Sequence, residues 1–365
     1  EWKFQKRRRG IRNTCVFAKT EVLKVTRKMK NFSSLEKSPH YPVMLDQVLE
    51  ICKPQKGGTF IDCTFGSGGY SNALLSFPKT KVVALDRDSQ IEKYVKETKN
   101  SYKDRFLFHT RKFSELNKVV ENKKKFDFII FDLGISSLQI FNLERGFSFN
   151  SKGKIDMCMG LNKISAEEVL NNFSLGTLND IFKFLGEEKE SFRIATNIVK
   201  ERKKKPISSI PDLVEIIKKS KKQDFKKKIN ISTKTFQAIR IFVNKEFTEL
   251  IEGLISATQA IKAGGKIIVI TFHSIEDKIV KFFFTNYSKN KSRTSRYYPD
   301  SYEEKTLFEN YKNKIIRPTE KELKENNPSR SAKLRFATRS QSDFFYPKEF
   351  KKNFIHYIDL ENRNV

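Results

Sequence analysis

The chain is poor in the side chains that build metal centres and disulfide frameworks. Its 365 residues contain four cysteines and four histidines, and no two cysteines form a C-x-x-C pair. These residues are scattered along the sequence as Cys15, Cys52, Cys63, Cys158, His40, His109, His273 and His356. We therefore expect no metal site and no disulfide scaffold. A reducing compartment such as the cytoplasm fits this cysteine usage.

Long apolar stretches and a surplus of acidic residues are also missing. No run reaches the roughly 18 apolar residues that a membrane helix needs, so we expect no membrane partner. Lys and Arg number 72 against 43 Asp and Glu, a formal charge of +29. This excess favours a nucleic acid as partner. The alternative is codon bias, because an AT-rich genome raises Lys, Asn, Ile and Phe together.

Residues 1–37 are basic and have no pattern of a folded core. They have three interpretations: an organelle-targeting peptide, a basic arm for RNA, or an extension upstream of a start at Met29. We favour the third interpretation. The expected localisation is then cytoplasmic, with an organelle as the alternative if the segment is a transit peptide.

Strand-like apolar runs alternate with helical patterns in the first part of the chain, which predicts an α/β fold with a parallel sheet. The predicted strands are Thr59–Asp62, Lys81–Asp86, Phe106–His109, Phe126–Asp132, Lys266–Thr271 and a last one near Lys333–Thr338. The fourth and fifth are 134 residues apart, far more than one crossover helix requires, and the intervening segments have helical periodicity. We therefore predict an α/β domain over 38–140 and 239–345, an inserted all-helical domain over 141–238, and a C-terminal tail over 346–365.

The segment GTFIDCTFGSGGYSN predicts a strand, a glycine turn and a helix start, as in nucleotide-like ligand sites. The Gly-Lys-Ser/Thr of a P-loop is absent, and the last glycine of G-x-G-x-x-G is missing. Asp62, Asp86 and Asp132 each end a predicted strand, at the edge where open α/β sheets bind ligands. Carboxylates suit a cationic donor and a ribose diol. S-adenosylmethionine is therefore the best candidate, and Phe113 is a candidate to stack on its adenine.

The chain resembles the bacterial 16S rRNA (cytosine-N4)-methyltransferases from about His40 to Arg339. The strings that carry the resemblance are GTFIDCTFGSGGYS, VVALDRD, FDLGISSLQ, ERGFSF, LGEE, TFQAIRIFVNKE, TFHSIEDKIVK and NPSRSAKLR. The resemblance implies a Rossmann-like class I S-adenosylmethionine-dependent methyltransferase sheet with a helical insertion. It implies methylation of the N4 amine of a cytidine in the decoding region of the small ribosomal subunit.

Carried over motif by motif, the resemblance implies donor contacts from Gly68, Gly69, Tyr70, Asp86, Phe113, Asp132 and Gln139. Tyr70 stands where the family usually has His, and Cys158 stands where it usually has Arg. Neither departure touches Asp86 or Asp132, so we expect activity.

The acceptor amine is a weak nucleophile, and the enzyme must align it with the methyl group and accept a hydrogen bond from it. Asp132 is the candidate catalytic carboxylate, and backbone carbonyls of 133–135 are equal candidates. RNA-binding candidates are Arg240, Asn244, His273, Arg330 and Arg335. Ser274 and Asp277 are expected to form a helix capping box. The alternatives to a methyltransferase are a non-catalytic ribosome-assembly factor, kept open by Tyr70 and Cys158, and a nucleotide-dependent oxidoreductase.

Overall fold

The computed structural model describes residues 41–120, 125–162, 164–221, 230–288 and 305–364. The predicted basic tail 1–37 and its targeting or RNA-arm interpretations lie outside these residues. Within them, no helix combines the length and the apolar character needed to cross a membrane.

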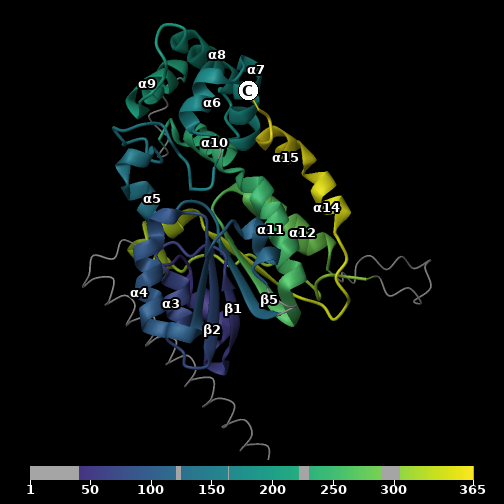
Figure 1. The fold of residues 1–365 in the computed structure, drawn as a ribbon. Helices are drawn as coiled ribbons and strands as arrows, with labels where there is room; N and C mark the ends of the chain where they lie inside the picture. Colours follow the sequence, from purple (N-terminus) through teal and green to yellow (C-terminus); the bar gives the residue numbers. More distant parts are fainter. Residues whose placement is uncertain (1–40, 121–124, 163, 222–229, 289–304, 365) are drawn as a thin grey trace, which may run out of the picture.

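A six-stranded sheet forms the base of the molecule (Figure 1). The strand order is β3-β2-β1-β4-β5-β6, and all neighbours are parallel except the antiparallel pair β5 and β6. The strands are β1 (Gly58–Asp62), β2 (Thr80–Asp86), β3 (Phe106–Thr110), β4 (Phe126–Asp132), β5 (Ile261–Thr271) and β6 (Lys333–Thr338). Each predicted strand is therefore confirmed, and so is the Rossmann-like α/β class. The apolar runs of the middle strands are buried on both faces, as parallel strands require.

Helices cover the sheet on both sides. One apolar cluster joins the sheet to α2 (Leu45–Cys52), α3 (Gly69–Leu75) and α4 (Glu92–Tyr102). A second cluster, on the other face, contains apolar side chains of α11 (Glu246–Ala260) and α12 (Ser274–Asn286). The short turn η4 (Phe113–Lys118) follows β3 and packs on α11, where Phe113 lies against Gly253.

The long segment between β4 and β5 is helical, as its periodicity predicts. It contains α5 (Ser137–Phe141), α6 (Ala166–Asn172), α7 (Leu175–Asp180), the π-helical turn η7 (Ile181–Leu185), α8 (Ser191–Arg202), α9 (Ile210–Ser220) and α10 (Thr233–Asn244). Figure 1 shows α6 to α10 gathered beyond one end of the strands. The bounds of the inserted domain stay a prediction.

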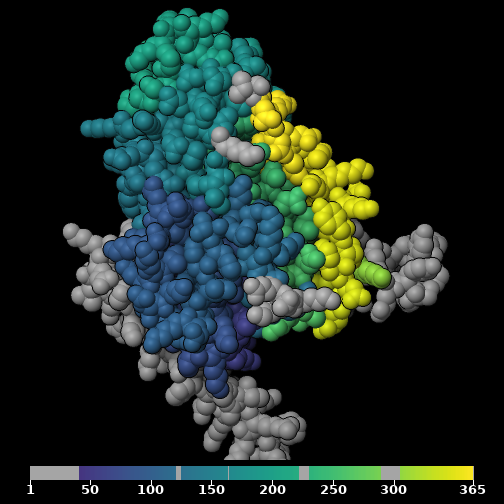
Figure 2. All heavy atoms as spheres, viewed as in Figure 1, coloured from purple at the N-terminus to yellow at the C-terminus, as the bar shows by residue number. Residues whose placement is uncertain are grey.

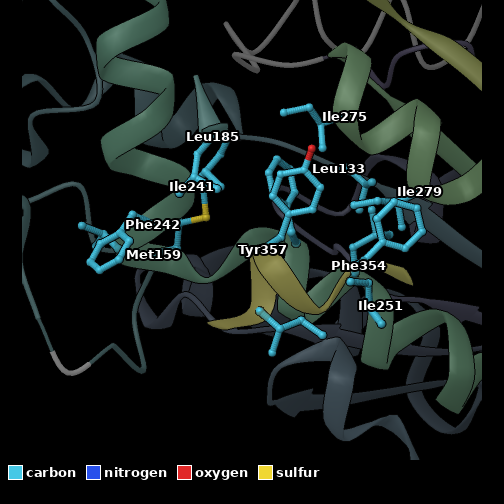
Figure 3. Close-up of a cluster of buried hydrophobic side chains, with 14 of the residues drawn as sticks. Leu133, Met159, Leu185, Ile241, Phe242, Ile251, Ile275, Ile279, Phe354 and Tyr357 are labelled. Carbon is cyan, nitrogen blue, oxygen red and sulfur yellow. The ribbon is translucent and has the colours of Figure 1, made fainter. Parts of the chain in front are cut away.

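The last residues of the chain connect the two parts of the molecule. After β6, the helices α14 (Lys348–Asn353) and α15 (Ile355–Glu361) run along one side from the sheet domain to the insertion (Figure 2). Another helix, α13 (Glu320–Glu325), precedes β6. Figure 3 shows Phe354 and Tyr357 packed among side chains of α10, α11 and α12. The segment 346–365, which we predicted as a tail, therefore contains two helices with buried apolar side chains.

Candidate active site

A cavity of about 490 Å³ opens at the carboxyl edge of the sheet, where β1, β2 and β4 end. This volume is in the usual range of small-molecule sites. The cavity brings together six of the seven predicted donor residues: Gly69, Tyr70, Asp86, Phe113, Asp132 and Gln139. They come from separate parts of the chain, so the fold creates the site.

Gly68 does not line this cavity. It has φ +82° and is the N-cap of α3, so its role is to turn the chain. A Cβ on Gly68 would lie 2.8 Å from Asn72 Nδ2 and 2.9 Å from the ring of Phe65. A Cβ on Gly69 would lie 2.3 Å from Pro42 Cγ. The glycines therefore permit close packing around the turn, while Gly66, Gly69 and Tyr70 face the cavity.

Two backbone N–H groups next to the glycine turn hold the Asp86 carboxylate. Its carboxylate accepts hydrogen bonds from the Gly66 N–H at 2.8 Å and the Asp88 N–H at 2.9 Å. Burial raises the pKa of Asp86, and these two hydrogen bonds oppose the rise. Each carboxylate oxygen still has a free lone pair, as a pair of ribose hydroxyls requires.

Asp132 combines burial with an unused acceptor. Its backbone N–H donates to the Thr64 hydroxyl oxygen at 2.9 Å, while its Oδ1 is buried and has no hydrogen-bond partner among the described residues. Burial raises the pKa of Asp132 well above its usual value, and the charge of Asp62 adds to the rise. A buried, unsatisfied carboxylate oxygen in this cavity fits a cationic donor or an amine N–H.

Asp62 does not contribute to the cavity, although it also ends a strand. Its side chain is fully buried and accepts the Ser71 hydroxyl at 2.7 Å and the Thr64 N–H at 3.2 Å. Burial raises the pKa of Asp62 to about 6, against these hydrogen bonds. Asp62 therefore fixes α3 to β1, and two strand-end carboxylates face the cavity instead of the three that we expected.

Gln139 lines the cavity, but both ends of its amide are already engaged. Its Oε1 accepts the Ser136 N–H at 3.0 Å, which caps α5, and its Nε2 donates to Asp88 at 2.9 Å. Asp88 also forms a buried ion pair with Arg145 at 2.6 Å. Asp88 and Arg145 lie in the motifs VVALDRD and ERGFSF, which alone indicate no role for either side chain.

Burial argues against two of the predicted RNA contacts. Asn244 is fully buried and bonds Met159 N–H, Met157 C=O and Asn162. Arg335 is 2% exposed and pairs with Asp277 at 2.6 Å. Both predictions share one weakness: in the sequence, a polar side chain that satisfies buried partners looks like a surface residue.

The other three candidates have different positions. Arg240 and His273 line the cavity, and Arg330 is exposed on the surface. The predicted capping box of α12 is displaced by one residue. His273 is the N-cap, and Glu276 accepts the His273 N–H at 3.3 Å. Ser274 instead donates to Glu187, and Asp277 pairs with Arg335.

The sequence did not reveal several other residues that line the cavity. They are Met159, Gln237, Glu249, Phe272, Asn327 and Ser331. Some lie inside quoted motifs: Gln237 in TFQAIR, Phe272 in TFHSIED and Asn327 in NPSRS. Their positions after strand ends or on a helix were the only available signal, and that signal does not tell which side chains face a ligand.

The family model of the MraW methylase family matches residues 37–340. The chain belongs to this family. Proteins called ribosomal RNA small subunit methyltransferase H are among its relatives. The one from Allorhizobium ampelinum is 41% identical, covering 82% of this chain and 87% of the relative. The one from Rickettsia bellii (strain RML369-C) is 42% identical, covering 82% and 98%.

A solved structure described as an rRNA methylase from Streptococcus thermophilus also matches this MraW-family chain. It shares 9% identity at a TM-score of 0.36, covering 80% of this chain and 96% of that one. A match with so low a TM-score and identity carries no argument about the site. Family membership itself confirms three predictions: a class I methyltransferase fold, methyltransferase activity and S-adenosylmethionine as donor.

The two departures from the family pattern leave the cavity intact. The Tyr70 hydroxyl donates to the Val43 carbonyl, and the buried ring lines the cavity. Cys158 does not line it, and its thiol lies 3.4 Å from the Ile164 carbonyl. The absence of a metal stays a prediction: among the described residues, side-chain atoms of Glu246, His273 and Glu276 lie within 4.8 Å of one another.

Proposed function

We propose that this protein transfers a methyl group from S-adenosylmethionine to the N4 amine of a cytidine in the decoding region of 16S rRNA, within the small ribosomal subunit. Family membership over residues 37–340 supports the proposal most strongly. The convergence of Asp86, Phe113 and Asp132 on one cavity supports the donor site. The oxidoreductase and assembly-factor alternatives find no comparable support.

Three parts of the cavity suit three parts of the donor. Asp86 is positioned for the ribose hydroxyls, Phe113 for the adenine face, and the turn at Gly69 and Tyr70 for the methionine end. The donor supplies an activated methyl group on a cationic sulfur. The Asp132 carboxylate, when ionised, stabilises positive charge in the buried cavity, because electrostatic attraction is stronger away from water.

The remaining wall of the cavity is the proposed acceptor side. The amine nitrogen of cytosine shares its lone pair with the ring, so a hydrogen-bond acceptor must draw on its N–H to free that pair. Asp132 Oδ1 and the backbone carbonyls of 133–135 are the candidate acceptors. The target cytidine must be unpaired or flipped out of its helix to enter.

We further propose that the insertion 141–238 recognises the RNA around the target. It presents much more surface than one base occupies, and many of its lysines are exposed. Arg330, also exposed, is a candidate phosphate contact. The proposed compartment is the cytoplasm, or an organelle if the segment before Met29 is a transit peptide.

Methyl transfer should be measured on small subunits that lack the modification and on a short hairpin of the same sequence. We expect modification of one cytidine on subunits and much slower reaction on the hairpin. Asp86→Asn should lose activity, while the exposed control Asp104→Asn should keep it. Equal rates on both substrates would contradict recognition by the insertion. No methylated cytidine on either would contradict the function itself.

A further inference from the structure

The helices α14 and α15 lie beyond the part of the chain that the family model matches, which ends at residue 340. They are nevertheless packed into the rest of the molecule, since Phe350, Phe354 and Tyr357 are all buried. Residues 341–365 contain four Lys and Arg and four Asp and Glu, so this segment adds nothing to the charge of +29. A neutral segment with buried aromatic rings fits a role in packing better than a role as an RNA arm.

The residue that begins α11 cannot cap the helix. Lys245 alone joins α10 to α11, with φ +51°, and its ammonium group has no lone pair to accept an N–H. It donates instead to Asn362 Oδ1 at 2.6 Å. Glu361 of α15 supplies the acceptors: its carboxyl group accepts the Phe247 N–H at 3.0 Å and the Thr248 N–H at 2.8 Å. The first turn of α11 is therefore capped by a side chain 114 positions from Phe247.

This first turn of α11 borders the cavity. Glu249 lines the cavity and pairs with Lys112, another lining residue, at 3.4 Å. The ring of Phe247 packs against the ring of His273, which also lines the cavity, with centroids 5.5 Å apart. The same Phe247 ring packs against Tyr357 of α15 with centroids 5.1 Å apart. A displacement of α15 would thus reach the cavity wall through one ring and one helical turn, because packed interiors transmit strain.

The segment that contains α14 and α15 is anchored on both sides of the junction between α10 and α11. Phe350 of α14 stacks on Phe283 of α12 with centroids 4.4 Å apart, and its N–H donates to the Tyr287 hydroxyl at 2.9 Å. At the other end, Arg363 pairs with Asp180 of α7, in the insertion, at 2.8 Å. Figure 2 shows this segment in yellow along the side of the molecule, from the sheet domain to the insertion.

We propose that α14 and α15 form a strap that positions the cavity wall at Glu249 and His273 for methyl transfer, by fixing the turn between the insertion and the sheet domain. The proposal rests on the proposed function. Tyr357 and Glu361 are the positioning residues of this strap. Both contact the first turn of α11, and within the described part of the chain neither belongs to the residues that line the cavity.

The expected effect follows from the geometry of methyl transfer. The acceptor nitrogen, the methyl group and the sulfur must be aligned, and a displacement of about 1 Å that starts far from the reacting atoms can reduce the rate about a hundredfold. Removing the ring of Tyr357 leaves a cavity beside Phe247, into which the Phe247 ring can move. The rate should therefore fall even when both substrates are saturating, because the bound substrates are misaligned.

The test is the single-turnover rate of methyl transfer on small subunits, with subunits and S-adenosylmethionine both saturating. Tyr357→Ala should lower this rate about tenfold to a hundredfold, whereas Tyr357→Phe, which keeps the ring, should keep the wild-type rate. Glu361→Ala should lower the rate in the same way, because it removes the cap of α11. Its matched control is Asp359→Ala, which changes an exposed acid on the same helix and should leave the rate unchanged.

Denaturant unfolding and a donor titration give the folded fraction of each variant, so that rates are compared per folded molecule. Donor affinity should stay close to that of the wild type, because Asp86 and the glycine turn do not contact the strap. If Tyr357→Ala does not fold, Tyr357→Leu keeps apolar volume at this position and should lower the rate in the same direction.

Three outcomes would overturn the proposal in different ways. Wild-type rates per folded molecule in the Tyr357 and Glu361 variants would show that the strap only stabilises the fold. A loss confined to the affinity for small subunits would show that the strap is an RNA contact. A wild-type protein that methylates no RNA would overturn the proposed function, and the proposal about the strap with it.

Discussion

Replacing Gly68 by alanine adds two free-energy costs that glycine avoids: left-handed backbone strain and crowding by neighbouring side chains. A control variant separates the two. Gly68 has φ +82°, and the added Cβ would meet Asn72 Nδ2 at 2.8 Å and Phe65 at 2.9 Å. Gly264 is a matched control, because it has φ +76° with nothing within 4 Å of its added Cβ. It lies in the first part of β5, at the edge of the sheet opposite the cavity.

Both substitutions carry the left-handed backbone strain of about 1–2 kcal/mol. Gly68→Ala adds a crowding cost of about 1–3 kcal/mol, because the neighbours are a ring and a helix side chain within a packed core. The ring is Phe65, which lines the cavity. If half or more of the crowding is relieved by displacement of the donor turn, affinity for S-adenosylmethionine should fall about tenfold, since 1.4 kcal/mol is one order of magnitude.

The assay is a calorimetric titration of each variant with S-adenosylmethionine, together with denaturant unfolding. We expect Gly264→Ala to lose stability alone and Gly68→Ala to lose more stability and donor affinity. Wild-type donor affinity in Gly68→Ala, with the same loss of stability as Gly264→Ala, would refute the reasoning. It would show that the turn is not shaped for the donor.

Three other predictions concern single groups and the charge. Asp86→Asn should weaken donor binding about tenfold or more, because hydrogen bonds to a charged acceptor contribute about 1.5–3 kcal/mol; an unchanged titration would exclude Asp86 as a ribose ligand. Burial raises the pKa of Glu361 to about 8 from 4.5, although the carboxyl accepts bonds from Phe247 and Thr248. The folded state thus prefers the protonated carboxyl, so the free energy of unfolding should decline as pH rises from 4.5 to about 8. Glu361→Gln should flatten this decline. A wild-type free energy of unfolding that does not decline over this range would contradict the assignment. RNA affinity should fall steeply with salt as phosphates release counterions, with the slope unchanged when residues 1–28 are removed; a flat dependence would show that the +29 charge does not act in binding.

The strands were predictable because each is a short, nearly continuous apolar run, and the run alone implies burial on two faces. The strand-end carboxylates Asp86 and Asp132 were predictable for a related reason: parallel strands bring their carboxyl ends to one edge. Asp62 satisfies the same rule and still does not face the cavity. Its neighbour Ser71, nine residues on, takes the carboxylate at 2.7 Å. The position of a residue at the end of a strand does not determine which group its side chain hydrogen-bonds.

The RNA-binding candidates were less predictable because they depend on the junction between the insertion and the sheet. Asn244 has helical spacing from Arg240, and both were assigned to RNA on that basis. In the structure Asn244 accepts the Met159 N–H at 2.9 Å and turns away from solvent. Such contacts join residues 85 positions apart, so no local pattern can carry them.

The segment LDRD illustrates how the donor site and the insertion are joined. Asp86 faces the cavity, and the next residue, Arg87, donates to the Asn244 carbonyl at 2.9 Å at the end of α10, the helix in which the predicted insertion 141–238 ends. Asp88 then forms the buried ion pair with Arg145, in the first part of that insertion. Three consecutive residues thus contact the donor cavity, the start of the insertion and the helix at its end. A movement of the insertion on RNA would act on Asp86 through its immediate neighbours, because buried ion pairs and backbone hydrogen bonds deform little before they break.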